Sequence, residues 1–263
     1  SYCIIPYVRS KLKNRNPQEI ITEIKNLISQ GYKEIVLTGI RLGKYRFDNV
    51  ESGITNLVDL LQELEKIKGL CRIRLSSLEI NEIDKKLLDL MVSSKKICPH
   101  LHVPLQSGDN EILRRMRRRY TIEEYTEKIR WIQDRIPEIG ITTDIMVGFP
   151  GEREENFFRT YECVKELEFS RLHVFPYSLR PNTVAAEFKE QIPANIKKLR
   201  REKFIQLDRL LRERFKEKFI GKKMEVLLDK EEKNGTYSGF TGNYIRLKVN
   251  QGKKNEILRL KIN

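Results

Sequence analysis

Apolar, β-branched runs alternate with amphipathic stretches of helical length through the first two thirds of the sequence. A first helix is expected from Pro17, behind an Asn16 cap, to Gly31, because its apolar residues recur every three or four positions. Helices of this length between strands imply right-handed crossovers and hence a parallel α/β sheet, open or barrel-like. The expected strands are 34–37, 71–75, 101–103, 141–147 and 171–175.

Further helices are expected between these strands, at residues 57–67, 83–91 and 154–167. Thr121 and Glu124 form a capping box, which predicts the start of another helix. In folds of this class the reactive residues gather on loops at the carboxyl ends of the strands. The chemistry of this chain is therefore to be sought on those loops.

The pattern changes near the C-terminus. A long charged helix is expected at residues 196–218, and four short alternating strands follow, which predict a small β-barrel or sandwich. We therefore expect a core of residues 1–195, a connecting basic helix of residues 196–218 and a β-barrel of residues 219–263. The expected strands of the barrel are 224–228, 237–240, 244–249 and 257–262.

The net charge of +14 is concentrated in the C-terminal quarter of the chain. Residues 196–263 contain 20 Lys or Arg and 9 Asp or Glu, whereas residues 1–195 contain 31 and 28. Such an excess favours a polyanionic partner such as nucleic acid, because each neutralised phosphate releases counterions. The alternative is a basic face that only meets solvent.

Hydropathy and cysteine spacing argue against a membrane protein or a secreted one. No run approaches the roughly 18 to 20 apolar residues that cross a bilayer, and no secretory signal opens the chain. We expect a cytoplasmic location. Cys71, Cys98 and Cys163 lie far apart in or near apolar runs, so they are expected to be small buried side chains rather than disulfide partners.

Four loops at expected strand ends carry residues suited to a small-molecule site. Glycines there would let the backbone approach a ligand, and Ser, Gln and Glu would supply hydrogen bonds to an amino acid or ribose. Each loop alone is a weak signal, but together they indicate one site. The loops are Thr38-Gly39, Ser76-Ser77-Leu78-Glu79, Pro104-Leu105-Gln106-Ser107-Gly108 and Gly148-Phe149-Pro150-Gly151-Glu152.

The N-terminal run Ser1-Tyr2-Cys3-Ile4-Ile5-Pro6-Tyr7-Val8-Arg9 resembles the end of the Cys-x-x-x-Cys-x-x-Cys motif of radical S-adenosylmethionine (SAM) enzymes, in the form found in methylthiotransferases. The four loops match that family in order, as do Arg118-Arg119-Tyr120-Thr121 and Asp144-Ile145-Met146-Val147. The resemblance implies a partial (β/α)6 radical SAM barrel with its first strand missing. It also implies that the C-terminal barrel is the family's TRAM domain, which binds RNA.

The resemblance implies a role for several residues and assigns no catalytic side chain. Cys3 would be the third thiolate ligand of a [4Fe-4S] cluster, whose open iron binds SAM. The residues expected to contact SAM are Thr38, Gly39, Ser76, Glu79, Gln106, Ser107, Val147 and Gly148. Those expected to contact RNA through charge or stacking are Lys222, Lys223, Tyr237, Tyr244, Arg246 and Lys248.

The family carries a second [4Fe-4S] cluster in a separate N-terminal domain, and nothing of that domain is recognisable here. We therefore expect the 263 residues alone to be inactive and their full-length parent to be an enzyme. The expected partners are tRNA and a reductase or flavodoxin-type electron donor. A monomer is favoured.

The run His173-Val174-Phe175-Pro176-Tyr177-Ser178-Leu179-Arg180-Pro181-Asn182-Thr183 most resembles the branch that methylthiolates N6-threonylcarbamoyladenosine in tRNA. Asn182 departs from the glycine usual in that run, although Asn also tolerates a left-handed backbone. Two alternatives stay within the family, namely the isopentenyladenosine branch and the branch acting on a ribosomal protein. A non-catalytic RNA-binding protein is the alternative of another class.

Overall fold

The computed structural model describes residues 1–9, 11–47, 53–232 and 235–263. Contacts divide the chain into two compact units. The first comprises residues 1–13, 103–132 and 141–215, and the second comprises residues 14–102, 133–140 and 216–263. The units thus cut across the expected core of residues 1–195, while the chain passes from one unit to the other close to the expected boundary at residue 219. The three-domain division stays a prediction.

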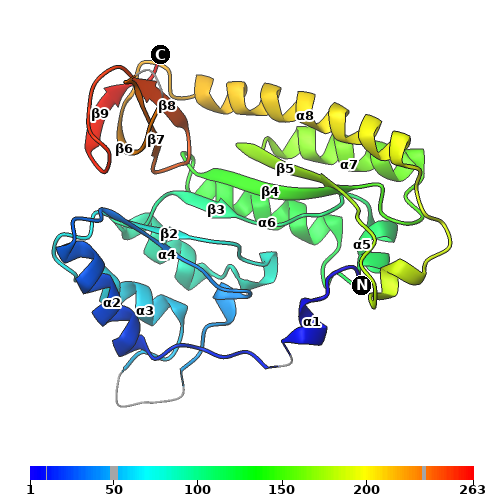
Figure 1. Cartoon of the computed structure of the whole chain (residues 1–263), viewed down its shortest axis with the longest axis horizontal. Coiled ribbons are helices and arrows are strands. Elements are labelled where there is room, and N and C mark those ends of the chain that lie inside the picture. The colour runs from blue at the N-terminus through cyan, green and yellow to red at the C-terminus, as the bar shows by residue number, and fades with distance from the viewer. Residues whose placement is uncertain (10, 48–52, 233–234) are drawn as a thin grey trace. The chain divides into compact units, whose positions relative to one another are not determined.

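The first unit contains two parallel strands with helices packed against them (Figure 1). Strands β4 and β5 pair in parallel from Thr142 opposite Arg171 to Val147 opposite Pro176. Large aromatic side chains fill the core of this unit, and Phe149, Phe157 and Phe169 are fully buried. Its elements are α1 (Ile5–Val8), α5 (Asn110–Met116), α6 (Ile122–Arg135), β4 (Gly140–Val147), α7 (Glu154–Leu167), β5 (Arg171–Pro176), η4 (Val184–Glu187) and α8 (Ala194–Glu217), of which α6, β4 and α8 have end residues in the second unit.

The N-terminal part of the second unit has a parallel pair of its own. Strand β1 pairs with β2 from Glu34 opposite Arg72 to Leu37 opposite Leu75, and Ser77 forms a parallel bridge to His102 at the end of β3. Leu61, Ile73 and Leu88 are completely buried between strands and helices. The elements are α2 (Pro17–Ser29), β1 (Glu34–Leu37), η1 (Leu42–Lys44), α3 (Leu57–Glu65), β2 (Arg72–Leu75), η3 (Ile80–Glu82), α4 (Lys85–Ser93) and β3 (His100–His102).

Local signals in the sequence account for the helix starts. The Asn16 side chain accepts a hydrogen bond from the Gln18 N–H at 2.9 Å, as its capping role requires. Thr121 and Glu124 exchange the two hydrogen bonds of a capping box. The expected mixed α/β class is confirmed, and each expected strand and helix is present within a few residues. Closure of the strands into a partial barrel stays a prediction.

The C-terminal residues form a four-stranded antiparallel sheet in the order β8-β7-β6-β9. Strand β6 is central and is bulged between Leu228 and Lys230. Gly239 is required there, because a Cβ at this position would lie 2.0 Å from the Leu227 carbonyl oxygen. The strands are β6 (Lys223–Glu231), β7 (Tyr237–Thr241), β8 (Arg246–Val249) and β9 (Ile257–Lys261). Its assignment as a TRAM barrel stays a prediction.

Two buried arginines of β2 join this C-terminal sheet to the β1–β2 pair. Arg72 is 6% exposed and donates to the carbonyls of Glu225 and Phe240 at 2.7 and 2.9 Å. Arg74 is 4% exposed and donates to the Gly242 carbonyl at 2.9 Å and to the Glu34 carboxylate at 2.8 Å. Each buried charge is therefore compensated by hydrogen bonds, as burial in a protein interior requires.

Replacing Arg74 with Leu is expected to lower the free energy of unfolding by roughly 3 kcal/mol, because the half-buried Glu34 carboxylate loses its closest cation and the C-terminal sheet loses a donor. Urea denaturation measures this change. Lys66→Leu is the control, because Lys66 pairs with Glu63 at the surface and should contribute under about 1 kcal/mol. The double variant Glu34→Leu, Arg74→Leu should recover part of the loss. Equal, small effects of Arg74→Leu and Lys66→Leu would contradict the compensated-charge explanation.

Candidate functional site

In the first unit, Gln106 lies beside the C-terminal half of β4. Its N–H donates to the Asp144 carbonyl at 2.8 Å, and its own carbonyl accepts from the Met146 N–H at 2.9 Å. The backbone of Gln106 is left-handed, with φ of 69°, which is uncommon for a residue with a side chain. Its side chain is buried, and Oε1 has no hydrogen-bond partner in the described part of the chain. A buried, unpaired amide oxygen is costly unless a ligand supplies a donor.

The neighbouring residue Ser107 serves the fold. Its hydroxyl lies 3.2 Å from the Thr160 hydroxyl of α7, and it also accepts from the Asp109 N–H at 3.3 Å. Both oxygens are buried. Contact of Ser107 with SAM stays a prediction.

The loop after β4 is closed by a buried carboxylate. Glu152 accepts hydrogen bonds from the N–H groups of Gly148 and Phe149. Arg200 of α8 donates to the Glu152 carbonyl at 2.9 Å, and its guanidinium lies 3.6 Å from the Glu152 carboxylate. Burial raises the pKa of Glu152 to about 7, against the opposing effect of Arg200 and the two N–H donors.

The space beside Gly148 is filled by the protein itself. Gly148 has φ of +68°, and a Cβ there would lie 2.4 Å from the Cγ atom of Lys197 in the first turn of α8. Lys197 Nζ donates to the Tyr177 carbonyl just after β5 at 3.0 Å. The glycine was expected to admit a ligand, whereas in the structure it admits a lysine side chain. Contact of Val147 and Gly148 with SAM stays a prediction.

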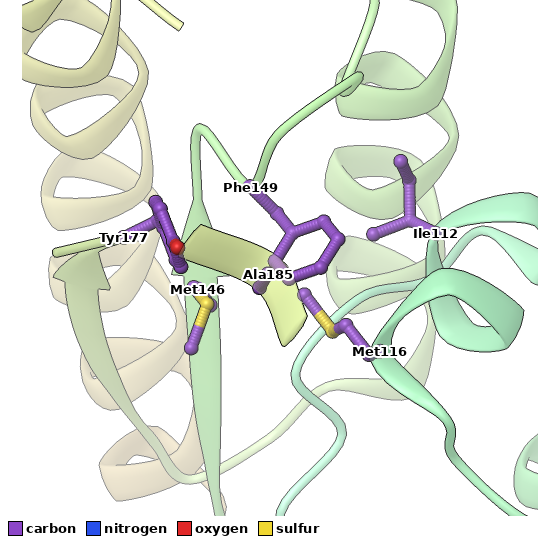
Figure 2. Close-up of a cluster of buried hydrophobic side chains, with 6 residues drawn as sticks. All are labelled: Ile112, Met116, Met146, Phe149, Tyr177 and Ala185. Carbon is purple, nitrogen blue, oxygen red and sulfur yellow. The ribbon is translucent and has the colours of Figure 1, made fainter. Parts of the chain in front are cut away.

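The segment that carries Cys3 is anchored through Ser1 and Tyr2. The Ser1 nitrogen and hydroxyl donate to the carbonyls of Met116 and Arg115 at 3.0 and 2.7 Å, and the Ser1 carbonyl accepts from the Ala185 N–H. Tyr2 packs edge-on against Phe149. Both anchors rest on the apolar cluster in Figure 2, and Cys3 itself is exposed. The cluster consists of Ile112, Met116, Met146, Phe149, Tyr177 and Ala185.

In the second unit, the strand-end residues lie next to one another. The Ser76 N–H donates to the Leu37 carbonyl at 3.0 Å, which places Ser76 beside the exposed Thr38-Gly39 loop. The Ser76 hydroxyl is buried without a partner in the described residues. Glu79 precedes η3, and its N–H donates to the Glu82 carboxylate at 3.4 Å. This unit thus holds one of the two predicted groups of SAM contacts, and the first unit holds the other.

The predicted RNA contacts of the C-terminal sheet differ in how far the fold uses them. Lys222, Lys223, Arg246 and Lys248 are exposed, and the last two alternate along β8 on its outer face. Lys222 pairs with Glu138 at 2.7 Å, and Arg246 pairs with Glu232 at 3.3 Å. Tyr237 is half-buried. Contact of these residues with RNA stays a prediction.

Tyr244 has a structural role, which is the alternative to RNA contact that aromatic residues of a small barrel always offer. Its ring stacks on His100 and on Phe240, with ring centroids 4.5 Å apart in both pairs. The Arg74 guanidinium lies 5.0 Å from the same ring centroid. Because its ring is already stacked within the protein, Tyr244 is poorly placed to stack on a nucleic-acid base.

Comparison with known proteins identifies the family. The profile of the radical SAM superfamily matches residues 1–164, which is more than half of the chain. The chain belongs to the radical SAM superfamily. Coproporphyrinogen III oxidase (HemN) from Escherichia coli, a radical SAM enzyme, superposes with a TM-score of 0.53 over 74% of this chain and 46% of that protein, at 18% identity. That likeness supports the fold of this radical SAM chain.

Curated relatives of this radical SAM chain modify tRNA. The threonylcarbamoyladenosine tRNA methylthiotransferases MtaB of Bacillus subtilis and Aquifex aeolicus are 39% and 44% identical over 94% of the chain. A tRNA-2-methylthio-N(6)-dimethylallyladenosine synthase of Thermodesulfovibrio yellowstonii is 40% identical over 100% of it. The chain covers 55%, 58% and 60% of these three proteins, so it spans somewhat more than half their length.

The described residues of this radical SAM chain do not complete a metal site. Among them, no three His, Cys, Asp or Glu side chains gather where they could hold a metal ion. Burial raises the pKa of the Cys98 and Cys163 thiols to about 11, which makes both poor thiolate ligands. Of the four cysteines, Cys3 alone lies in the run that resembles the family's motif, and its role as a cluster ligand stays a prediction.

Several residues that shape the site were missed from the sequence. The sequence places Glu152 in a strand-end loop but indicates no structural role for Glu152, Lys197, Arg200 or Tyr177. Tyr177 follows β5, is 3% exposed, and its hydroxyl has no partner in the described residues. A Lys and an Arg at the start of a charged helix carry no signal that they reach back to a strand end.

The substitution Glu152→Gln is expected to change how stability depends on pH. The folded-state pKa of about 7 exceeds the ordinary 4.5, so the folded protein holds this proton more tightly. The contribution of the neutral acid is therefore full below about pH 4.5 and is lost as the pH rises through 7. Over that range the wild-type protein should lose up to roughly 3 kcal/mol relative to the glutamine variant.

Urea denaturation between pH 5 and 8 measures this difference. Glu154→Gln is the matched control, because Glu154 also pairs with Arg200 but is exposed. That variant should run parallel to the wild type across the pH range. A parallel course for Glu152→Gln as well would show that burial of Glu152 does not raise its pKa.

Proposed function

We propose that the full-length protein containing this chain transfers a methylthio group to N6-threonylcarbamoyladenosine in tRNA by radical SAM chemistry. The observation that carries the proposal is the 39% to 44% identity to two threonylcarbamoyladenosine tRNA methylthiotransferases over 94% of the chain. The run from His173 to Thr183 supports the same branch. Its Asn182 adopts φ of +65°, so this Asn provides the left-handed turn that a glycine would provide.

The chain's own residues would hold and orient SAM. The unpaired Gln106 Oε1 and Ser76 Oγ are each suited to a polar group of such a ligand. Thr38, Gly39, Glu79, Ser107, Val147 and Gly148 complete the proposed set of contacts. A bound [4Fe-4S] cluster would supply one-electron reduction of SAM, which makes an inert purine C–H bond accessible to reaction.

Cys3 would provide one thiolate for that cluster, and its exposed sulfur on an anchored segment suits a ligand that needs partners from elsewhere. The other thiolates, and the ligands of a second [4Fe-4S] cluster, would come from residues outside these 263. Iron and sulfide reconstitution of the 263 residues alone should therefore yield no stable cluster and no SAM cleavage. Four irons per chain with SAM cleavage would contradict this expectation.

The C-terminal sheet would bind the RNA substrate. Lys222, Lys223, Arg246 and Lys248 offer cations to phosphates, and Tyr237 offers a ring for stacking. Assignment of this sheet to a TRAM barrel belongs to the same proposal. The proposed electron donor is a reductase or flavodoxin-type protein, and the proposed enzyme is cytoplasmic and monomeric.

No helix in the described ranges has the length and apolar character needed to cross a membrane.

The dimethylallyladenosine branch is the second candidate, because a synthase of that branch is 40% identical over 100% of the chain. A ribosomal-protein methylthiotransferase and a non-catalytic RNA-binding protein are the remaining alternatives. The three enzymes would form different products, and the RNA-binding protein would form none. Mass spectrometry of tRNA nucleosides separates the two tRNA branches, and mass spectrometry of ribosomal proteins tests for a ribosomal-protein methylthiotransferase.

The decisive experiment expresses the full-length gene in a strain that lacks both tRNA methylthiotransferases. We expect the 2-methylthio derivative of N6-threonylcarbamoyladenosine to return. Cys3→Ala should abolish it while changing the free energy of unfolding by no more than about 0.5 kcal/mol, because Cys3 is exposed. Return of the isopentenyladenosine product alone would favour the second branch. Product formation by the Cys3→Ala variant would refute the cluster assignment.

A further inference from the structure

Helix α8 is the most basic element of the first unit, and only part of its charge serves the fold. Its 24 residues include nine Lys or Arg and four Asp or Glu. The helix lies along α7 in Figure 1, where Phe204 packs against Phe157 and Tyr161 with ring centroids 5.5 and 5.6 Å apart. The buried face consists of Arg200, Phe204, Leu207, Leu211 and Phe215.

Four cations form a row on the part of α8 that faces away from this packing. At 3.6 residues per turn, Lys198, Arg201, Arg209 and Arg212 fall within about 80° of one another around the helix axis. All four side chains are exposed. At 1.5 Å per residue, the row is about 21 Å long. We call these four residues the α8 basic row.

The basic row differs from the other cations of α8 in what it contacts. Arg200 is bonded to the Glu152 loop, Lys197 donates to the Tyr177 carbonyl, and Lys203 lies over the ring of Phe158. In contrast, Lys198, Arg201 and Arg209 make no ion pair within the described ranges. Arg212 reaches Asp208 at 3.7 Å, a distance at which an exposed pair contributes little.

Within the row, Lys198 and Arg201 repel each other across one helical turn, as do Arg209 and Arg212. A polyanion with regularly spaced charges would remove that repulsion and release its own counterions. Guanidinium groups also bind phosphate oxygens in a bidentate manner, and the three arginines of the row are exposed and available for such contacts. The row therefore fits the backbone of a nucleic acid.

We propose that the α8 basic row binds the phosphate backbone of the tRNA substrate. It would be a contact surface on the first unit, additional to the C-terminal sheet of the second unit. The identity of the polyanion as tRNA rests on the proposed function. Phosphate contacts position a nucleic acid without reading its sequence, so the row would raise affinity for any tRNA equally.

The test compares how two triple variants of the 263-residue chain bind tRNA in a filter-binding assay. The salt concentration is varied over roughly 50 to 300 mM, because phosphate contacts are progressively screened in that range. The row variant is Lys198→Gln, Arg201→Gln, Arg209→Gln. The control variant is Lys66→Gln, Lys85→Gln, Lys165→Gln, which removes the same charge from exposed lysines paired with acidic neighbours. Thermal unfolding of both variants verifies that they are folded.

The row variant should bind tRNA about tenfold or more weakly at low salt, and its slope of log affinity against log salt should fall by roughly two to three. The control should keep the wild-type slope. Equal slopes for both variants, or no tRNA binding by the wild-type chain, would overturn the proposal. Loss of binding to anionic phospholipid vesicles with unchanged tRNA binding would assign the row to a membrane surface and overturn it too.

This experiment is independent of the enzyme's product. If nucleoside analysis finds no methylthiolated adenosine but the row variant loses tRNA affinity, the proposed reaction fails and the binding surface stands. If the product forms and both variants bind tRNA equally, the reaction stands and the binding surface fails.

Discussion

The second unit depends on two charged side chains that its most buried strand cannot leave unpaired. All four residues of β2 are buried, yet two of them are arginines. A guanidinium in such a position is tolerated only if its donors find acceptors. The acceptors come from Glu34 on the neighbouring strand and from backbone carbonyls of the C-terminal sheet more than 150 residues later. Folding of the β1–β2 pair and docking of that sheet are thereby energetically linked.

The same linkage explains the position of Tyr244. Its ring lies near the Arg74 guanidinium and stacks on His100 and Phe240. Tyr244 therefore belongs to the interface between the C-terminal sheet and strands β2 and β3. An RNA-binding surface on the C-terminal sheet would therefore be carried by its exposed cations. One face of this sheet, which carries Tyr244, packs against strands β2 and β3, whereas Arg246 and Lys248 are exposed to solvent.

Much of the secondary structure could be predicted, because its signals are local. The cap at Asn16, the capping box at Thr121 and Glu124 and the apolar periodicities each specify their own segment. Helix α5, with seven residues, is too short to display a periodicity, although Asp109 caps it through the Ile112 N–H. The residues next to Gly148 could not be predicted, because Lys197 is nearly 50 positions away in the sequence. The sequence likewise indicates that Arg72 and Arg74 need partners but does not say which.

The contact between Gly148 and Lys197 has a consequence for building hybrid enzymes from relatives of this chain. Lys197 in the first turn of α8 fills the space beside the loop after β4, and Arg200 in the second turn holds Glu152. A recombination point at Ala194, where α8 begins, would thus separate the loop after β4 from Lys197 and Arg200, which pack against it. A crossover placed after the second turn would keep Lys197 and Arg200 together with the loop that they contact.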